Sequence, residues 1–268
     1  MPSEKTGSYQ VVEVEVKKNL TLYTLDNGEV LSLSPSVAAD FYLYRQKVIQ
    51  VDDLKAIKLA QQKRLLFDYV IKKMRGHYLS EATATSLLFD YAENKSLISS
   101  VIKDLKNKHY LDDERLTKII IERYQEKLCG NHKIIDELKK ARIKHEIVDN
   151  LSLSEEDEEA RGEILVPQLE KKLPRISAQS RKKKIYQQLL RLGYGREIAS
   201  SLLVHLSAKD DEVEETLLKR DFEKALKRYS KKYEKYDLSR HIVNYLLTKG
   251  YTYSDIKKVV EGQNNDMD

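Results

Sequence analysis

The sequence has no tryptophan, one cysteine, four prolines and nine glycines in 268 residues. A single cysteine, Cys129, excludes an internal disulfide, which fits a reducing compartment. No apolar run reaches the roughly 18 residues that a membrane-spanning helix needs, and the opening MPSEKTGSYQ lacks the apolar stretch of a signal peptide. We therefore expect a cytoplasmic protein that makes no membrane contact.

Sequence signatures of catalysis are missing as well. The chain has no phosphate-binding loop, no dinucleotide fingerprint and no nucleophile elbow. Cys129 and His132 are three residues apart, but no second pair stands at zinc-ligand spacing. The Asp112-Asp113-Glu114 cluster is a candidate carboxylate site, although helix capping explains it more simply. We expect neither an enzyme nor a bound metal or cofactor.

The N-terminal residues are predicted to form a small β unit. In VVEVEVKK, the valines at positions 12, 14 and 16 alternate with charged residues, which is typical of a strand with one apolar face. Asn27-Gly28 favours a type I′ hairpin turn, in which both central residues have positive φ. From residue 53 onward the apolar period becomes that of amphipathic helices. Predicted helix caps are Ser80, Asp112, Ser154, Ser177, Asp237 and Ser254.

A repeated sequence motif divides the helical part into units. LLRLGYGREI, residues 189–198, recurs as LLTKGYTYSDI, residues 246–256, and LKKARIKHEI from Leu138 fits the same frame. A looser match starts at Leu87, so the matches are 51, 51 and 57 residues apart. Such a period predicts tandem units of about 50 residues with three helices each, in which the glycine ends the second helix.

We therefore predict a mainly α fold. Tandem three-helix repeats form an elongated, curved array after a small N-terminal β-hairpin unit. The expected segments are a β unit at 1–52 and helical repeats at 53–111, 112–153, 154–208 and 209–268.

Charge is distributed unevenly around a net value of +5. Residues 154–163 are strongly acidic, residues 171–196 hold nine Lys and Arg without an acid, and residues 219–240 are basic again. A solvated helix face is the common meaning of such a run, and a surface for phosphate or an acidic protein is the alternative. KRYSKKYEKY, residues 227–236, also has two interpretations. Its tyrosines face a core along one helix, or they form a surface on which nucleic-acid bases stack.

One stretch has a recognisable pattern. It combines a helix with Val101 and Leu105, the block Tyr110-Leu111-Asp112-Asp113-Glu114-Arg115, and a helix with Gly130, Ile134 and Leu138 closed by Ile143. In these features residues 97–143 resemble the RecX family of RecA regulators, and the Asp26-Asn27-Gly28 hairpin and LLTKGYTYSDIKKVV resemble its longer members. The family usually has glycine where this chain has His109 and Arg142.

The resemblance implies a non-enzymatic, monomeric regulator that binds RecA and RecA–DNA filaments. It implies lowered recombinase, ATPase and co-protease activity in DNA recombination, DNA repair and the SOS response, with weak direct DNA binding. A helical-repeat protein that binds nucleic acid independently of RecA is the alternative.

Basic residues of the second and third units are our candidates for the surface that binds the RecA filament or DNA: Arg115, Arg123, Lys133, Arg142, Arg175, Arg181, Lys182, Lys183, Lys184 and Arg191. Residues 181, 182 and 184 span about 300° of a helix at roughly 100° per residue, so we expect one or two of them in solvent. The structural motif residues are Tyr110, Leu111, Asp112, Asp113, Gly130, Ile134, Leu138, Gly193 and Gly250.

Overall fold

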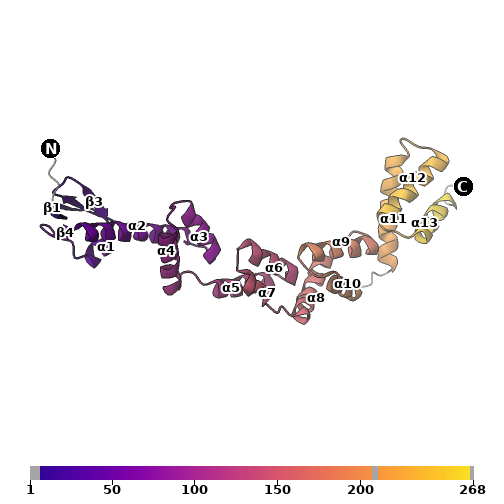
Figure 1. Cartoon of the computed structure of the whole chain (residues 1–268). Coiled ribbons are helices and arrows are strands. Elements are labelled where there is room, and N and C mark those ends of the chain that lie inside the picture. Colours follow the sequence, from indigo (N-terminus) through magenta and orange to yellow (C-terminus); the bar gives the residue numbers. More distant parts are fainter. Residues whose placement is uncertain (1–6, 207–210, 266–268) are drawn as a thin grey trace. The chain divides into compact units, whose positions relative to one another are not determined.

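The computed structural model describes residues 7–206 and 211–265. The N-terminal elements are β1 (Ser8–Val16), β2 (Thr21–Leu25), β3 (Val30–Leu33), α1 (Pro35–Asp40) and β4 (Val48–Gln50) (Figure 1). The next six helices are α2 (Val51–Lys73), α3 (Glu81–Phe89), α4 (Lys95–Asn107), α5 (Asp113–Glu126), α6 (Asn131–Lys140) and α7 (His145–Asp149). They are followed by α8 (Glu155–Lys171), α9 (Ala178–Arg191), α10 (Arg196–Ser201), the 3-10 turn η1 (Leu202–His205), α11 (Asp211–Tyr229), α12 (Lys235–Thr248) and α13 (Tyr253–Asn265).

The β unit is an antiparallel sheet with strand order β3-β2-β1-β4. Two details of its prediction are wrong. The residues at 12 and 16 are exposed and Val11 is buried instead, because the pairing of β1 with β2 shifts between Val11 and Glu13. The hairpin turn is not type I′, because only Gly28 of the Asn27-Gly28 pair has positive φ, and the loop has three residues.

The helices follow the predicted tandem frame. Within the second helix of each repeat one leucine is fully buried: Leu88 in α3, Leu138 in α6, Leu189 in α9 and Leu246 in α12. A buried apolar residue precedes each by four positions, and another follows each by ten, in the third helix: Ala84, Ile134, Ile185 and Ile242, then Ile98, Val148, Ala199 and Ile256. In the first repeat the buried leucine is Leu88 and not the predicted Leu87. Successive residues point about 100° apart around a helix, so only one of the two can face the core. The fold is thus mainly α, with tandem three-helix repeats and a small N-terminal β unit.

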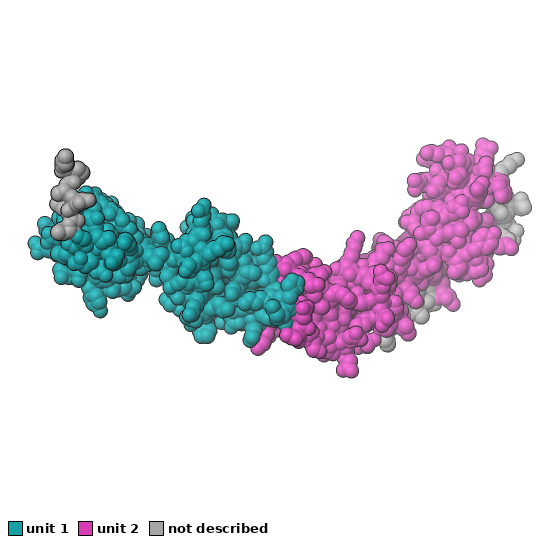
Figure 2. Space-filling model, in the orientation of Figure 1, with its two compact units in different colours: residues 1–117, 141–147 teal, residues 118–140, 148–268 magenta. Residues whose placement is uncertain are grey.

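Two compact units divide the chain (Figure 2). The first comprises residues 1–117 and 141–147, and the second comprises residues 118–140 and 148–268. The boundary passes through α5, so the units differ from the predicted segments, and the five-segment division stays a prediction.

The Tyr-Leu-Asp-Asp block closes the first repeat and begins α5. The ring of Tyr110 meets Phe67 of α2 edge-on, with centroids 5.8 Å apart. Leu111 is buried in the core of the first repeat. The carboxylate of Asp112 accepts a hydrogen bond of 2.9 Å from the backbone N–H of Arg115, so Asp112 caps α5 as predicted.

Most of the other predicted caps are confirmed. The side chains of Ser80, Ser154 and Ser177 each accept a hydrogen bond from the backbone N–H three residues later. Two of the predicted caps are wrong. Residues 237 and 254 lie inside α12 and α13, and the hydroxyl of Thr252 accepts the N–H at the start of α13.

A recurring contact joins successive repeats. A carboxylate from the first helix of one repeat accepts a backbone N–H at the start of the second helix of the repeat before it. The pairs are Asp113 with Glu81 (2.9 Å), Glu158 with Asn131 (3.1 Å) and Glu214 with Ala178 (2.9 Å). The first N–H groups of a helix have no partner within the helix, and the helix dipole favours a negative charge there. These carboxylates therefore fix where each repeat meets the next.

Residues with a left-handed backbone conformation form several of the corners between helices. Gly193 follows α9 with φ 85° and Gly250 follows α12 with φ 84°. His109 and Arg142 adopt φ of 56° and 57°, although neither is glycine. The chain therefore keeps these two corners at the cost of backbone strain. Gly130 lacks a positive φ and is needed for space, because a Cβ there would lie 2.3 Å from the backbone of Gly193.

Candidate functional site

The candidate basic residues are distributed over several elements. Exposed residues include Arg115 and Arg123 on α5, Arg142 after α6, and Arg175, Lys182, Lys183, Lys184 and Arg191 on or beside α9. Lys133 is partly buried and pairs with Glu137 at 3.1 Å. Of these candidates, Arg175, Lys184 and Arg191 take part in clefts described below.

The prediction for Arg181 as a surface residue is wrong. Its side chain is 11% exposed and forms an ion pair with Glu170 of α8 at 3.5 Å. α9 turns this position toward α8, where Ile185 and Leu189 also pack, while the next three lysines face solvent. Arg181 is therefore part of the structure of the third repeat and unavailable to a partner.

A basic cleft of about 810 Å³ lies where the third repeat meets the fourth. Its walls come from the start of α9, from the middle of α11 and from the end of α12. The lining residues are Arg175, Ile176, Ser177, Ser180, Lys184, Arg220, Asp221, Lys224, Tyr245, Thr248 and Lys249. Within this lining, five cations face one carboxylate, so the cleft has a strong positive potential.

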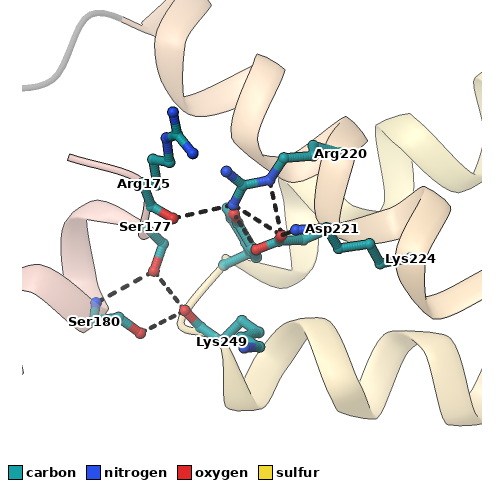
Figure 3. A network of polar contacts seen from close by, with 8 residues as sticks. Arg175, Ser177, Ser180, Arg220, Asp221, Lys224 and Lys249 are labelled. Atoms are coloured by element: carbon teal, nitrogen blue, oxygen red, sulfur yellow. Dashed lines mark hydrogen bonds and ion pairs between the residues drawn. The ribbon is translucent and has the colours of Figure 1, made fainter. Parts of the chain in front are cut away.

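A polar network holds the two walls together (Figure 3). The hydroxyls of Ser177 and Ser180 donate to the backbone carbonyl of Lys249, the latter at 2.6 Å. Across the cleft, the Arg220 guanidinium donates to the carbonyl of Arg175 at 3.0 Å. In Figure 3 the guanidinium of Arg175 points away from the two serines.

Asp221 is the centre of the fourth repeat's side of this network. It is 7% exposed and accepts hydrogen bonds from Arg220 at 2.9 Å and from the Tyr251 hydroxyl at 3.1 Å. Lys224 lies 3.7 Å from the same carboxylate. Burial, with the neighbouring carboxylate second, raises the pKa of Tyr251. Asp221 is thus fully engaged, whereas Lys184 and Lys249 have no carboxylate partner among the residues that the structure describes.

A second cleft of about 440 Å³ lies beside the first, between α8 and α9. Lys172, Lys184 and Arg191 line it together with apolar residues and two glutamines. Lys184 lines both clefts, so the two clefts share one cation on the exposed face of α9.

A series of aromatic rings extends from the larger cleft. Tyr245 lines the cleft, and its ring lies 6.1 Å from Tyr229, which stacks on His241 at 5.7 Å. His241 stacks in turn on Tyr233 at 3.9 Å. The prediction that the tyrosines of residues 227–236 share one helical face is wrong, because α11 ends at Tyr229 and Tyr236 is 79% exposed.

Sequence reasoning missed most of the cleft. Arg220, Lys224, Tyr245 and Lys249 belong to it, and none was a candidate. The basic run of residues 219–240 was a signal for the first two. No sequence feature distinguishes Lys249, whose position follows from the corner at Gly250.

The chemistry of a metal centre or reactive thiol is not assembled in residues 7–206 and 211–265. Within these ranges no three His, Cys, Asp or Glu side chains are grouped to hold a metal ion. Cys129 is buried, and burial raises the pKa of its thiol. In the described part of the chain no helix is both long and apolar enough to cross a bilayer.

These features define a tandem three-helix repeat protein with a basic cleft between its third and fourth repeats. No protein-family model matches the sequence. A regulatory protein RecX of Streptococcus pneumoniae is 30% identical over 259 residues, covering 92% of this chain and 96% of the relative. A regulatory protein RecX of Streptococcus agalactiae serotype Ia is 26% identical over 260 residues, covering 94% and 98%.

The chain belongs to the RecX family. A crystal structure of a regulatory protein RecX has the same fold, with a TM-score of 0.56 at 16% identity, covering 72% of this chain and 98% of the other. The resemblance seen in residues 97–143 is therefore confirmed, and it extends over nearly the whole chain.

Proposed function

We propose that this protein binds RecA and RecA–DNA filaments in the cytoplasm and lowers their recombinase, ATPase and co-protease activities. It acts as a regulator and not as an enzyme. Full-length similarity to regulatory RecX proteins is the observation that carries the proposal. The basic face of α9, with the cleft beside it, supports the proposal because positive charge steers binding to DNA and to acidic protein surfaces.

The candidate contacts are now the exposed basic residues. They are Arg115, Arg123, Arg142, Arg175, Lys182, Lys183, Lys184 and Arg191, with the partly buried Lys133. We place the main filament contact on α9, where three consecutive lysines are exposed.

The test measures ATP hydrolysis by the cognate RecA on single-stranded DNA. Replacing Lys182, Lys183 and Lys184 by Glu should leave the melting temperature nearly unchanged, because exposed substitutions shift stability little. It should strongly weaken inhibition, and the deficit should be larger at low salt, where exposed charges are less screened.

The control is a variant with the same change of charge in the first repeat. Lys72, Lys95 and Lys103 are also exposed, and their replacement by Glu should leave inhibition intact. Equal inhibition by both variants would place the contact elsewhere. Absence of inhibition by the parent protein would contradict the proposal itself.

Direct nucleic-acid binding without RecA is the second candidate. The stacked rings beside the basic cleft favour it, because single strands bind by phosphate contacts and base stacking. In that case binding to an oligonucleotide without RecA should be tight and should weaken steeply as salt rises.

A further inference from the structure

We propose that the cleft lined by α9, α11 and α12 binds a compact, multiply charged phosphate anion, such as a free triphosphate. The ligand would bridge the third and fourth repeats. This activity goes beyond filament binding and does not require RecA.

The charge of the cleft is the first argument. Its lining holds Arg175, Lys184, Arg220, Lys224 and Lys249 against Asp221 alone, a formal charge of +4. Bringing like charges together disfavours the empty arrangement unless a counter-charge is present. A ligand with a single carboxylate would leave most of this charge uncompensated, whereas a triphosphate matches it.

The protein's own acids are already committed elsewhere. Asp221 is shared among Arg220, Lys224 and the Tyr251 hydroxyl. The start of α9, a natural place for an anion, is filled by the carboxylate of Glu214. The guanidinium of Arg175 and the ammonium groups of Lys184 and Lys249 are therefore the donors left for an external ligand.

The cleft has room for a ligand of this size. A volume of about 810 Å³ lies in the range of roughly 300–1,000 Å³ that small-molecule sites occupy. The hydrogen bonds from Ser177 and Ser180 to Lys249, and from Arg220 to Arg175, hold both walls in place before a ligand arrives. A preformed site spends less free energy on ordering.

Two kinds of ligand carry such a phosphate group, and they can be distinguished. Tyr245 forms part of the wall, with Tyr229 edge-on to its ring at 6.1 Å and the Lys249 ammonium 5.3 Å from its centroid, so a nucleotide base has an aromatic side chain next to the phosphate site. A free nucleoside triphosphate uses both features, whereas inorganic triphosphate uses the charge alone.

Isothermal titration of the full chain with inorganic triphosphate tests the site in the absence of RecA. We expect saturable 1:1 binding that weakens with salt. Replacing Lys184, Lys224 and Lys249 by Gln should weaken it by about tenfold or more, because each charged hydrogen bond contributes to affinity. The matched control replaces Lys118, Lys139 and Lys227, exposed lysines outside both clefts, by Gln, and should bind as the parent does.

Thermal unfolding is the second measurement. Triphosphate should raise the Tm of the parent and of the control variant but not of the cleft variant, since ligands stabilise the state that binds them. Tighter binding of ATP than of inorganic triphosphate would identify a nucleotide as the ligand. If oligothymidylate binds in the cleft and neither triphosphate does, the cleft binds a nucleic-acid backbone and the proposal is wrong. Absence of saturable binding, or equal loss in both lysine variants, would overturn the proposal and leave filament regulation untouched.

Discussion

Replacing Gly193 by alanine tests how the second repeat meets the third. Gly193 has φ 85°, and a Cβ there would lie 2.3 Å from the backbone nitrogen of Lys133 in α6. The same corner accepts two backbone hydrogen bonds, from Gly130 to the carbonyl of Leu192 at 2.8 Å and from His132 to the carbonyl of Gly193 at 3.0 Å. A Cβ at this site meets backbone, so rotation of a side chain cannot relieve the overlap.

The expected cost is the sum of two effects. A left-handed conformation costs an L-residue about 1–2 kcal/mol. Moving the corner away from α6 loses two hydrogen bonds, each with a net value of about 1 kcal/mol, and more if the N–H groups stay buried. Gly193→Ala should therefore lower the free energy of unfolding by about 3–5 kcal/mol.

Gly250→Ala is the matched control, at the equivalent corner of the fourth repeat and in the same compact unit. Its φ is 84°, and an added Cβ would lie 3.0 Å from the hydroxyls of Ser177 and Ser180 and 3.1 Å from the backbone nitrogen of Ser180, a much milder overlap than at Gly193. Urea unfolding followed by far-UV circular dichroism should show a cost of about 1–2 kcal/mol, mainly from conformation. If Gly250→Ala costs as much as Gly193→Ala, the close packing of the corner on α6 is not what stabilises it.

Four further outcomes follow from the described contacts. Arg142→Gly should stabilise the protein in urea by about 0.5–1 kcal/mol, because relief of the left-handed strain exceeds the entropy of the added glycine; a loss of stability would contradict this. Asp112→Ala should cost about 1 kcal/mol through the lost cap of α5, and no loss would refute that role. Arg181→Ala should cost about 3–5 kcal/mol because it breaks a mostly buried ion pair with Glu170, and a neutral result would return Arg181 to the surface candidates. The hydrogen bond from Lys140 is the main cause that lowers the pKa of Glu137 to about 2, so its stabilisation is complete above its unfolded pKa of about 4.3 and is lost as pH falls toward 2; acid titration of Glu137→Gln should lack this component.

The repeat frame and the starts of α3, α5, α8 and α9 were predictable from the sequence. Leu138, Leu189 and Leu246 are all fully buried, as the repeated sequence motif predicts. Ser80 and Asp112 cap their helices as expected, since a cap depends on residues within one turn. Local rules suffice here because helix period and capping involve neighbours along the chain.

Several local details were not predictable, for reasons that lie in pairing. A one-residue shift between β1 and β2 buries Val11 and leaves Val12 and Val16 exposed. The buried leucine of the first repeat is Leu88 and not Leu87. The short sequence of this helix matches the repeated motif only loosely, so it does not indicate which face of the helix packs on the core.

Only the tertiary structure decided the candidate site. A basic run predicts charge on α9, but the rotation of that helix against α8 buries Arg181 beside Glu170 and leaves Lys184 exposed. The carboxylates of Asp113, Glu158 and Glu214 reach the preceding repeat across 27 to 36 residues of sequence. Such contacts depend on how whole helices are placed against each other, within a few tenths of an ångström for a hydrogen bond. The cleft exists for the same reason: the corner at Gly250 brings Lys249 to the start of α9, a spacing that no periodicity in the sequence encodes.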